Sequence, residues 1–235
     1  MSNQSVSKGK ALNENLVGGR GILGGTFDPI HIGHLRIALE VWEGLGLDAV
    51  HLIPNGVPPH RDMPHADSAQ RLAMVKLAID DEPSLVADTL EIDRVVSSLG
   101  NSTASQSYMV DTLQTVRAGV GVDYPLFLIM GCDAFLQLDT WHRWDELIQY
   151  SHLVLVQRPG WSMPDEHPML AYYKAHENRN DQDRMKPAGR IFSIVCSQLE
   201  VSASTLRQRV KNGQSIRYLV PTAVDEYIQQ HGLYL

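Results

Sequence analysis

Short apolar runs alternate along this chain with segments whose apolar residues recur at helical spacing. The runs predict β-strands at 21–23, 49–53, 126–130, 153–156 and 191–195, and residues 85–92 are a further candidate strand. Residues 126–130 are all apolar, which is typical of a strand buried on both faces of a parallel sheet. Predicted helices separate most of these strands.

The intervening segments carry signals for helix starts and stops. Leu35, Ala38, Leu39 and Trp42 share one helical face, and Gly44 and Gly46 are expected to end that helix. Further helices are predicted from Asp67 or Ser68, from Ser107, over 141–149, over 204–212 before Gly213, and from Pro221. The alternation predicts α/β architecture: a Rossmann-like doubly wound parallel sheet, helices on both faces, in a single domain.

Composition supports one sizeable core, since the 235 residues are 43% hydrophobic and show no internal repeat. Residues 1–19 are polar and small, so we expect a flexible N-terminal tail ahead of a domain at 20–235. They contain no apolar segment long enough for a signal peptide or membrane span, which favours a cytoplasmic protein with no membrane partner. Residues 55–66 follow a strand and are expected to form a binding loop, whereas 160–189 is expected to be a surface excursion.

Charge and cysteine usage narrow the function further. A net charge of −7 argues against a nucleic-acid partner, although a small phosphorylated ligand needs only a few local cations. Cys132 and Cys196 lack metal-ligand spacing and cannot build a disulfide framework, so both are interpreted as buried structural residues.

The segment from Gly24 to His34 reads Gly-Gly-Thr-Phe-Asp-Pro-Ile-His-Ile-Gly-His, and it joins a predicted strand to a predicted helix. Free backbone N–H groups and the helix dipole make such a junction favourable for an anion. His31 and His34 add hydrogen-bond donors. Each residue alone is also compatible with an ordinary turn or a solvated histidine, but their order together predicts a phosphate-binding site.

Several motifs in fixed order carry a resemblance to a known family. They are 24–34 with His31-Ile32-Gly33-His34, 53–61 with Pro58-Pro59-His60-Arg61, Ser107-Tyr108 with 111–113, Gly131-Cys132-Asp133 with Trp141 and Trp144, and 201–207. The chain resembles the nucleotidyltransferase superfamily marked by (T/H)-x-G-H, and within it the bacterial nicotinate mononucleotide adenylyltransferases. The resemblance implies transfer of an adenylyl group from ATP to nicotinate mononucleotide, with release of pyrophosphate, in NAD biosynthesis.

The resemblance also implies roles for individual residues. The ATP site would comprise Gly24, Gly25, Thr26, Phe27, Asp28, His31, His34, Asp133, Ser202, Ser204 and Arg207, with His31, His34 and Arg207 as the catalytic residues. The attacking phosphate monoester is mostly ionised near neutral pH, because its second pKa is about 6. The protein must therefore supply positioning and positive charge rather than a general base.

The acceptor site would comprise Asn55, His60, Arg61, Tyr108, Met109 and Trp141. An indole stacks well on a flat pyridine ring, so Trp141 is assigned to the ring, while Trp144 fits equally a helix face. Met109 stands where the family usually has threonine, Ser204 replaces another threonine, and Arg61 stands where lysine often follows Pro-Pro-His. The polar segment 97–106 is longer than the family pattern needs and could reshape the acceptor pocket.

Magnesium is expected to arrive with ATP, because the sequence shows no carboxylate cage for a protein-held metal. A homo-oligomer and a preference for nicotinate or nicotinamide are both left open. Three alternatives share part of the pattern. Class I aminoacyl-tRNA synthetases need a Lys-Met-Ser-Lys-Ser type loop and an anticodon-binding domain that this chain lacks. Phosphopantetheine adenylyltransferases lack the Pro-Pro-His loop, and a noncatalytic nucleotide sensor need not retain every phosphate contact.

Overall fold

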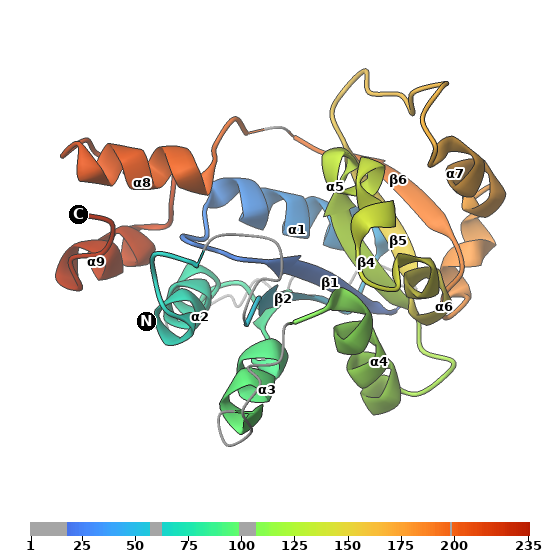
Figure 1. The fold of residues 1–235 in the computed structure, drawn as a ribbon, viewed down its shortest axis with the longest axis horizontal. Helices are drawn as coiled ribbons and strands as arrows, with labels where there is room; N and C mark the ends of the chain where they lie inside the picture. The colour runs from blue at the N-terminus through green and yellow to red at the C-terminus, as the bar shows by residue number, and fades with distance from the viewer. Residues whose placement is uncertain (1–17, 57–62, 99–106, 198) are drawn as a thin grey trace, which may run out of the picture.

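Six parallel strands form one sheet in the order β3-β2-β1-β4-β5-β6 (Figure 1). The structure is a computed structural model that describes residues 18–56, 63–98, 107–197 and 199–235. The strands are β1 (Arg20–Gly25), β2 (Ala49–Pro54), β3 (Leu85–Ala87), β4 (Leu126–Gly131), β5 (His152–Gln157) and β6 (Ile191–Val195). The chain adds β2 and β3 on one side of β1 and β4 to β6 on the other. The carboxyl ends of β1 and β4 therefore flank the point where the strand order reverses, where ligands bind in such sheets.

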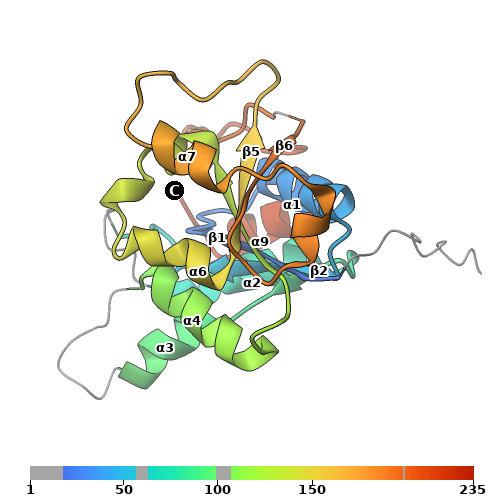
Figure 2. The ribbon, with the colours of Figure 1, turned by 90° about the vertical axis from the view of Figure 1, so that its right-hand side faces the viewer.

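Helices cover both faces of the sheet, as the sequence predicts (Figure 2). In the described chain they are α1 (Ile32–Leu45), α2 (Ser68–Ala78), α3 (Leu90–Ser98), α4 (Met109–Val120), α5 (Cys132–Leu136), α6 (Leu147–Tyr150), α7 (Leu170–His176), α8 (Ala203–Lys211) and α9 (Thr222–Gln230). One core cluster joins the sheet to α1, α2, α8 and α9, and a second joins it to α4, α5 and α6. No helix in the described ranges is long and apolar enough to cross a membrane.

The central strand β4 shows why apolar runs become strands here. Phe127 and Ile129 pack into the first cluster, whereas Leu128 and Met130 pack into the second. Successive side chains of a strand point to opposite faces, so a strand covered on both sides must be apolar at every position. The doubly wound sheet is confirmed in this way.

The candidate strand at 85–92 is wrong in its second half. β3 ends at Ala87, and α3 begins at Leu90. The Asp88 carboxylate accepts a hydrogen bond from the Leu90 N–H at 3.0 Å, and the Thr89 hydroxyl donates to Asp93 at 2.6 Å. These local bonds start a helix and stop the sheet ladder.

The segment 141–149 is also not one helix. It contains a 3₁₀ turn, η2 (Trp144–Glu146), followed by α6, and Arg143 adopts a φ of +50° that interrupts a right-handed helix. α4 begins after Tyr108 rather than Ser107, and α1 continues through Gly44 to Leu45.

The excursion at 160–189 contains more structure than expected. It holds α7 and a 3₁₀ turn, η3 (Asp181–Met185), and Tyr172 packs against the second core cluster. Asp183 binds Lys186 at 2.6 Å and Arg190 at 3.0 Å, which ties the end of the excursion together. The tail at 1–19 lies outside the described residues as far as residue 17, and β1 begins at Arg20.

Candidate active site

The turn after β1 depends on Gly25 and Phe27, which lie two positions apart and pack against each other. Phe27 has a φ of +49°, a left-handed conformation that bulky residues rarely adopt, and its ring is only 2% exposed. A Cβ atom on Gly25 would lie 2.8 Å from Cε1 of Phe27. Gly25 therefore leaves room for the ring, and the packed ring in turn stabilises the strained turn.

His31 and His34 meet at the start of α1, where His31 is the N-cap. The rings stack with centroids 3.7 Å apart, and the His31 N–H donates to Nδ1 of His34 at 3.3 Å. An acceptor at Nδ1 places the proton of a neutral His34 on Nε2. Burial lowers the pKa of His31 to about 4, and burial together with His31 lowers the pKa of His34 to about 3. Both rings are therefore neutral hydrogen-bond donors at pH 7.

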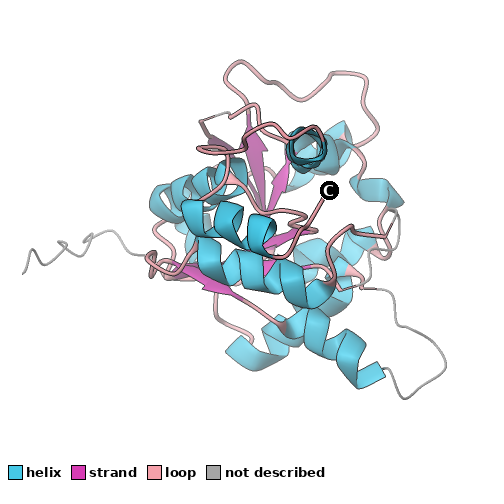
Figure 3. Cartoon of the chain, turned by 90° about the vertical axis from the view of Figure 1, so that its left-hand side faces the viewer, coloured by secondary structure: helices cyan, strands magenta, loops and turns pink. Residues whose placement is uncertain are grey.

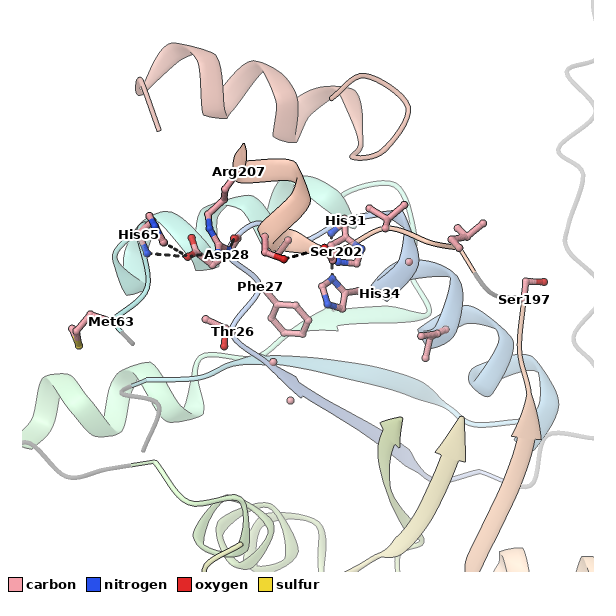
Figure 4. A pocket seen from close by; sticks show the side chains of 18 residues that line it. Thr26, Phe27, Asp28, His31, His34, Met63, His65, Ser197, Ser202 and Arg207 are labelled. Carbon is pink, nitrogen blue, oxygen red and sulfur yellow. Dashed lines mark hydrogen bonds and ion pairs between the residues drawn. The ribbon is translucent and has the colours of Figure 1, made fainter. Parts of the chain in front are cut away.

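A second helix start faces this pair. Ser202 is the N-cap of α8, and its Oγ accepts a hydrogen bond from the Thr205 N–H at 3.2 Å and lies 3.1 Å from Oγ of Ser204. Figure 4 shows Ser202 beside His31 and His34. Two helix N-termini and their dipoles thus converge on one space, which favours a polyanion.

That space is a cavity of about 900 Å³. Its lining includes every residue assigned from the sequence to the ATP site except Asp133: Gly24, Gly25, Thr26, Phe27, Asp28, His31, His34, Ser202, Ser204 and Arg207. Asp133 is exposed at the start of α5 and lines neither this cavity nor the one described below. The lining also contains Ile37, Met63, His65 and Val201, which sequence reasoning did not assign.

A second cavity of about 430 Å³ lies against the carboxyl ends of β1 and β4. Asn55, Tyr108, Met109 and Trp141 line it, as assigned from the sequence. His60 and Arg61 lie outside the described residues. Trp144 is not in this lining; it begins the 3₁₀ turn η2 and packs edge-on against Tyr172 with ring centroids 5.0 Å apart.

Further residues of the second cavity were missed. Gln137, Thr140 and His142 line it, and the ring of His142 lies 4.3 Å from that of Tyr108. All three follow β4 in the sequence, and ligands bind beyond the carboxyl ends of strands in such sheets. Their position after a predicted apolar strand could therefore have indicated a place in the site.

The two cavities share Gly24, Gly25 and Thr26. A Cβ atom on Gly24 would lie 2.5 Å from Cε of Met109 and 3.9 Å from Oδ1 of Asn55. The bare Gly-Gly backbone therefore separates two binding spaces by little more than the thickness of one chain. Such spacing suits a reaction between two bound molecules.

Arg71 of α2 fixes the loops around this shared turn, although nothing in the sequence singled it out. Its side chain is 1% exposed, and it donates to the carbonyls of Thr26 at 2.8 Å, Asn55 at 2.7 Å and Gly56 at 3.2 Å. An arginine fork can hold several carbonyls at once in this way.

Glu91 of α3 binds the backbone N–H of Gly56, the residue whose carbonyl Arg71 also binds. It is 2% exposed and accepts hydrogen bonds from the Thr112 hydroxyl at 2.8 Å and the Gly56 N–H at 3.3 Å. Burial raises its pKa. The sequence does not reveal this role, because its pattern favours a strand over residues 85–92.

The larger cavity offers few protein ligands for a divalent cation. Among the described residues, no cluster of three or more histidine, cysteine or acidic side chains could hold a metal. Among the described residues that line this cavity, Asp28 is the acidic one. Its carboxylate already accepts hydrogen bonds from the backbone N–H groups of His65 and Ala66 and from the Tyr234 hydroxyl. A cation there would have to be held mainly by ligand oxygens and water.

Known proteins match the chain across this whole arrangement. The cytidylyltransferase-like family model covers residues 22–209. A protein of Pseudomonas putida (strain W619) named "Probable nicotinate-nucleotide adenylyltransferase" is 46% identical over 217 residues, which are 91% of this chain and 94% of that protein. A protein of the same name from Cellvibrio japonicus (strain Ueda107) is 44% identical over 91% of this chain and 97% of its own length.

Among solved structures, the chain resembles the nicotinic acid mononucleotide adenylyltransferase of Plasmodium falciparum, solved in complex with NaAD. The TM-score is 0.66 at 14% identity, over 92% of this chain and 96% of that one. This likeness supports the fold. The Gly24–His34 turn and the residues that line both cavities lie within the matched range 22–209, and the relatives match 91% of the chain at 44–46% identity. The chain therefore belongs to the cytidylyltransferase-like family and, within it, to the nicotinate-nucleotide adenylyltransferases.

Proposed function

We propose that this protein transfers the adenylyl group of ATP to nicotinate mononucleotide, giving nicotinate adenine dinucleotide and pyrophosphate. The observation that carries the proposal is the pair of cavities on either side of Gly24, Gly25 and Thr26. ATP occupies the larger cavity and the mononucleotide the smaller one. The acceptor phosphate then attacks the α-phosphorus of ATP across the shared turn.

The residues of the larger cavity act by holding charge. His31 and His34 are neutral, so each donates a hydrogen bond to the triphosphate rather than accepting a proton. Ser202, Ser204 and the α8 N-terminus receive the β and γ phosphates, with Arg207 as the cation. We expect Mg²⁺ to enter with ATP and to neutralise part of the triphosphate charge.

The smaller cavity accepts the pyridine ring and its carboxylate. Trp141 stacks on the ring, and the backbone at Tyr108 and Met109, where α4 begins, receives the carboxylate. Asn55 lies beside the shared turn. His60 and Arg61 remain proposed acceptor contacts, and Asp133 remains a proposed ATP contact.

The direct test is a coupled assay of pyrophosphate release from ATP. Nicotinate mononucleotide, nicotinamide mononucleotide and phosphopantetheine are offered in turn at equal concentration. The proposal expects rapid release with the first. Release with phosphopantetheine alone would assign a different acceptor, and no release with any of them would favour a nucleotide sensor.

Trp141→Ala tests the acceptor site separately. Removing the indole is expected to raise the KM for the mononucleotide by about 10- to 100-fold, because ring stacking is lost, while the KM for ATP changes little. Trp144→Ala is the matched control, since Trp144 lines neither cavity. Steady-state kinetics with each substrate varied in turn provide the measurement, and an unchanged acceptor KM in Trp141→Ala would place the ring elsewhere.

A further inference from the structure

Asp28 lines the larger cavity, yet its carboxylate forms its hydrogen bonds with other residues of the protein. The residue is 4% exposed. Oδ2 accepts a hydrogen bond from the His65 N–H at 2.9 Å, and Oδ1 accepts one from the Ala66 N–H at 3.1 Å. Oδ1 accepts another from the Tyr234 hydroxyl at 2.8 Å. A buried carboxylate bonded in this way is a fixed part of the frame rather than a free ligand for ATP.

Arg207 takes its position from the same residue. It donates to the Asp28 carbonyl oxygen at 2.6 Å, and its Nη1 lies 3.8 Å from Oδ2 of Asp28. Figure 4 shows Arg207 and His65 on either side of Asp28. Any change in how Asp28 is held therefore reaches the guanidinium that faces the cavity.

Tyr234 brings the end of the chain into this cluster, although it lies 206 residues from Asp28 in sequence. Figure 3 looks at this end of the molecule and marks the C-terminus on it. Leu233 is buried, and its N–H donates to the Ile228 carbonyl at 3.0 Å, so α9 anchors the segment. Burial and the neighbouring Asp28 raise the pKa of the Tyr234 hydroxyl, which keeps it protonated as a donor.

We infer that Tyr234 is a positioning residue for adenylyl transfer: its hydroxyl holds the Asp28 carboxylate, and Asp28 in turn holds Arg207 against the triphosphate. The inference rests on the proposed function, because it assigns Arg207 to ATP. It makes the C-terminal residues part of the active-site frame rather than a surface end.

The first experiment is Tyr234→Phe in the full chain, which removes one hydroxyl and keeps the ring. We expect kcat/KM for ATP to fall about tenfold, the size of one lost hydrogen bond to a charged group, while the KM for the mononucleotide stays within about twofold. Tyr227→Phe makes the same change on α9 and should leave both parameters unaltered. Unchanged kinetics in Tyr234→Phe would overturn the inference.

The second experiment separates positioning from stability. If Tyr234 acts through Arg207, adding Tyr234→Phe to Arg207→Ala causes no further loss in kcat/KM for ATP. An equal tenfold loss in both backgrounds would overturn the inference, as would a loss explained by a lowered Tm and a smaller active fraction at unchanged KM.

A binding measurement keeps the inference distinct from the proposed function. If the wild-type protein releases no pyrophosphate with nicotinate mononucleotide, the proposed function fails, but calorimetric titration with ATP and with inorganic pyrophosphate still reports on Arg207. Tyr234→Phe should weaken both ligands by a similar factor, and again only when Arg207 is present. Equal affinities for wild type and variant would reject the positioning role.

Discussion

The imidazole of His34, in the first turn of α1, is held in place by two neighbouring residues. His34 accepts the His31 N–H and lies edge-on to the Phe27 ring with centroids 5.1 Å apart. Its Nε2–H is therefore directed by two neighbours that do not depend on the ligand. A donor fixed in advance costs little reorganisation when charge develops, and it is expected to act most strongly in the transition state.

His34→Ala is expected to lower kcat by about 100-fold or more while changing the KM for ATP only a few-fold. Single-turnover and steady-state rates of pyrophosphate release measure the two effects. A near-normal kcat would remove His34 from catalysis, whereas a large KM effect alone would make it a ground-state binding residue.

Gly24 lines both cavities, and the absence of a side chain there leaves room for Met109. A Cβ there would lie 2.5 Å from Cε of Met109, the far end of a flexible side chain that lines the second cavity and would have to move. We expect Gly24→Ala to raise the KM for the mononucleotide about tenfold with a small change in Tm. Adding Met109→Ala should restore much of the affinity. Failure of this rescue would show that the backbone of the turn, not Met109, is the sensitive part.

At the scale of elements, side chains of α2 and α3 stabilise the loops that follow β1 and β2. Arg71 of α2 holds three carbonyls, and Glu91 of α3 holds the Gly56 N–H. The loop after β2 is thus clamped from both sides at Asn55 and Gly56. Asn55 and Gly56 are the last described residues before the Pro-Pro-His segment, which lies outside the described ranges.

Arg71→Ala is expected to cost about 3–5 kcal/mol in the free energy of unfolding, because a buried side chain is removed and one buried and two part-buried carbonyls lose their donor. Arg71→Lys keeps one cationic donor and should recover part of this loss. Chemical denaturation measures both, with Arg179→Ala as a control expected within about 0.5 kcal/mol, since Arg179 is 75% exposed. A cost no larger than that of the control would show that the loops hold themselves.

At the scale of the whole molecule, the strand order decides where chemistry occurs. The strand order reverses between β1 and β4, which are paired in one continuous sheet, and both cavities contact the carboxyl end of β1 there. The same compact packing buries uncharged histidines. Burial lowers the pKa of His31 to about 4, of His34 to about 3 and of His152 in β5 to about 4.

These lowered pKa values predict acid sensitivity. Above the unfolded-state pKa near 6.5, the imidazoles are neutral in both the folded and the unfolded state, so they cause no loss of stability. Between pH 6.5 and pH 3–4 the unfolded state binds more protons than the folded state, so the free energy of unfolding falls as the pH falls. We expect a loss of a few kcal/mol between pH 7 and pH 4. Denaturation of the wild type and of His31→Gln/His34→Gln at both pH values tests this. An equal loss in both proteins would assign the acid sensitivity to other groups.

The sequence alone determined the features that short segments carry within themselves. The Gly-Gly turn, the cap at Asp67 and the apolar run of β4 each specify local structure, and the ordered motifs identify the family. Local signals failed at two places. A side-chain bond from Asp88 to the Leu90 N–H starts a helix where a strand was expected, and the left-handed φ of Arg143 interrupts an expected helix.

Only the tertiary structure decided which distant residues meet. Tyr234 contacts Asp28, Arg71 contacts Thr26, and His142 lines the second cavity, because the strand order and helix packing bring these segments together. It also placed Asp133 outside both cavities, although its motif neighbours line one of them. Periodicity records which face of an element is buried, but it carries no information on what that face meets, which depends on how the whole chain closes around the sheet.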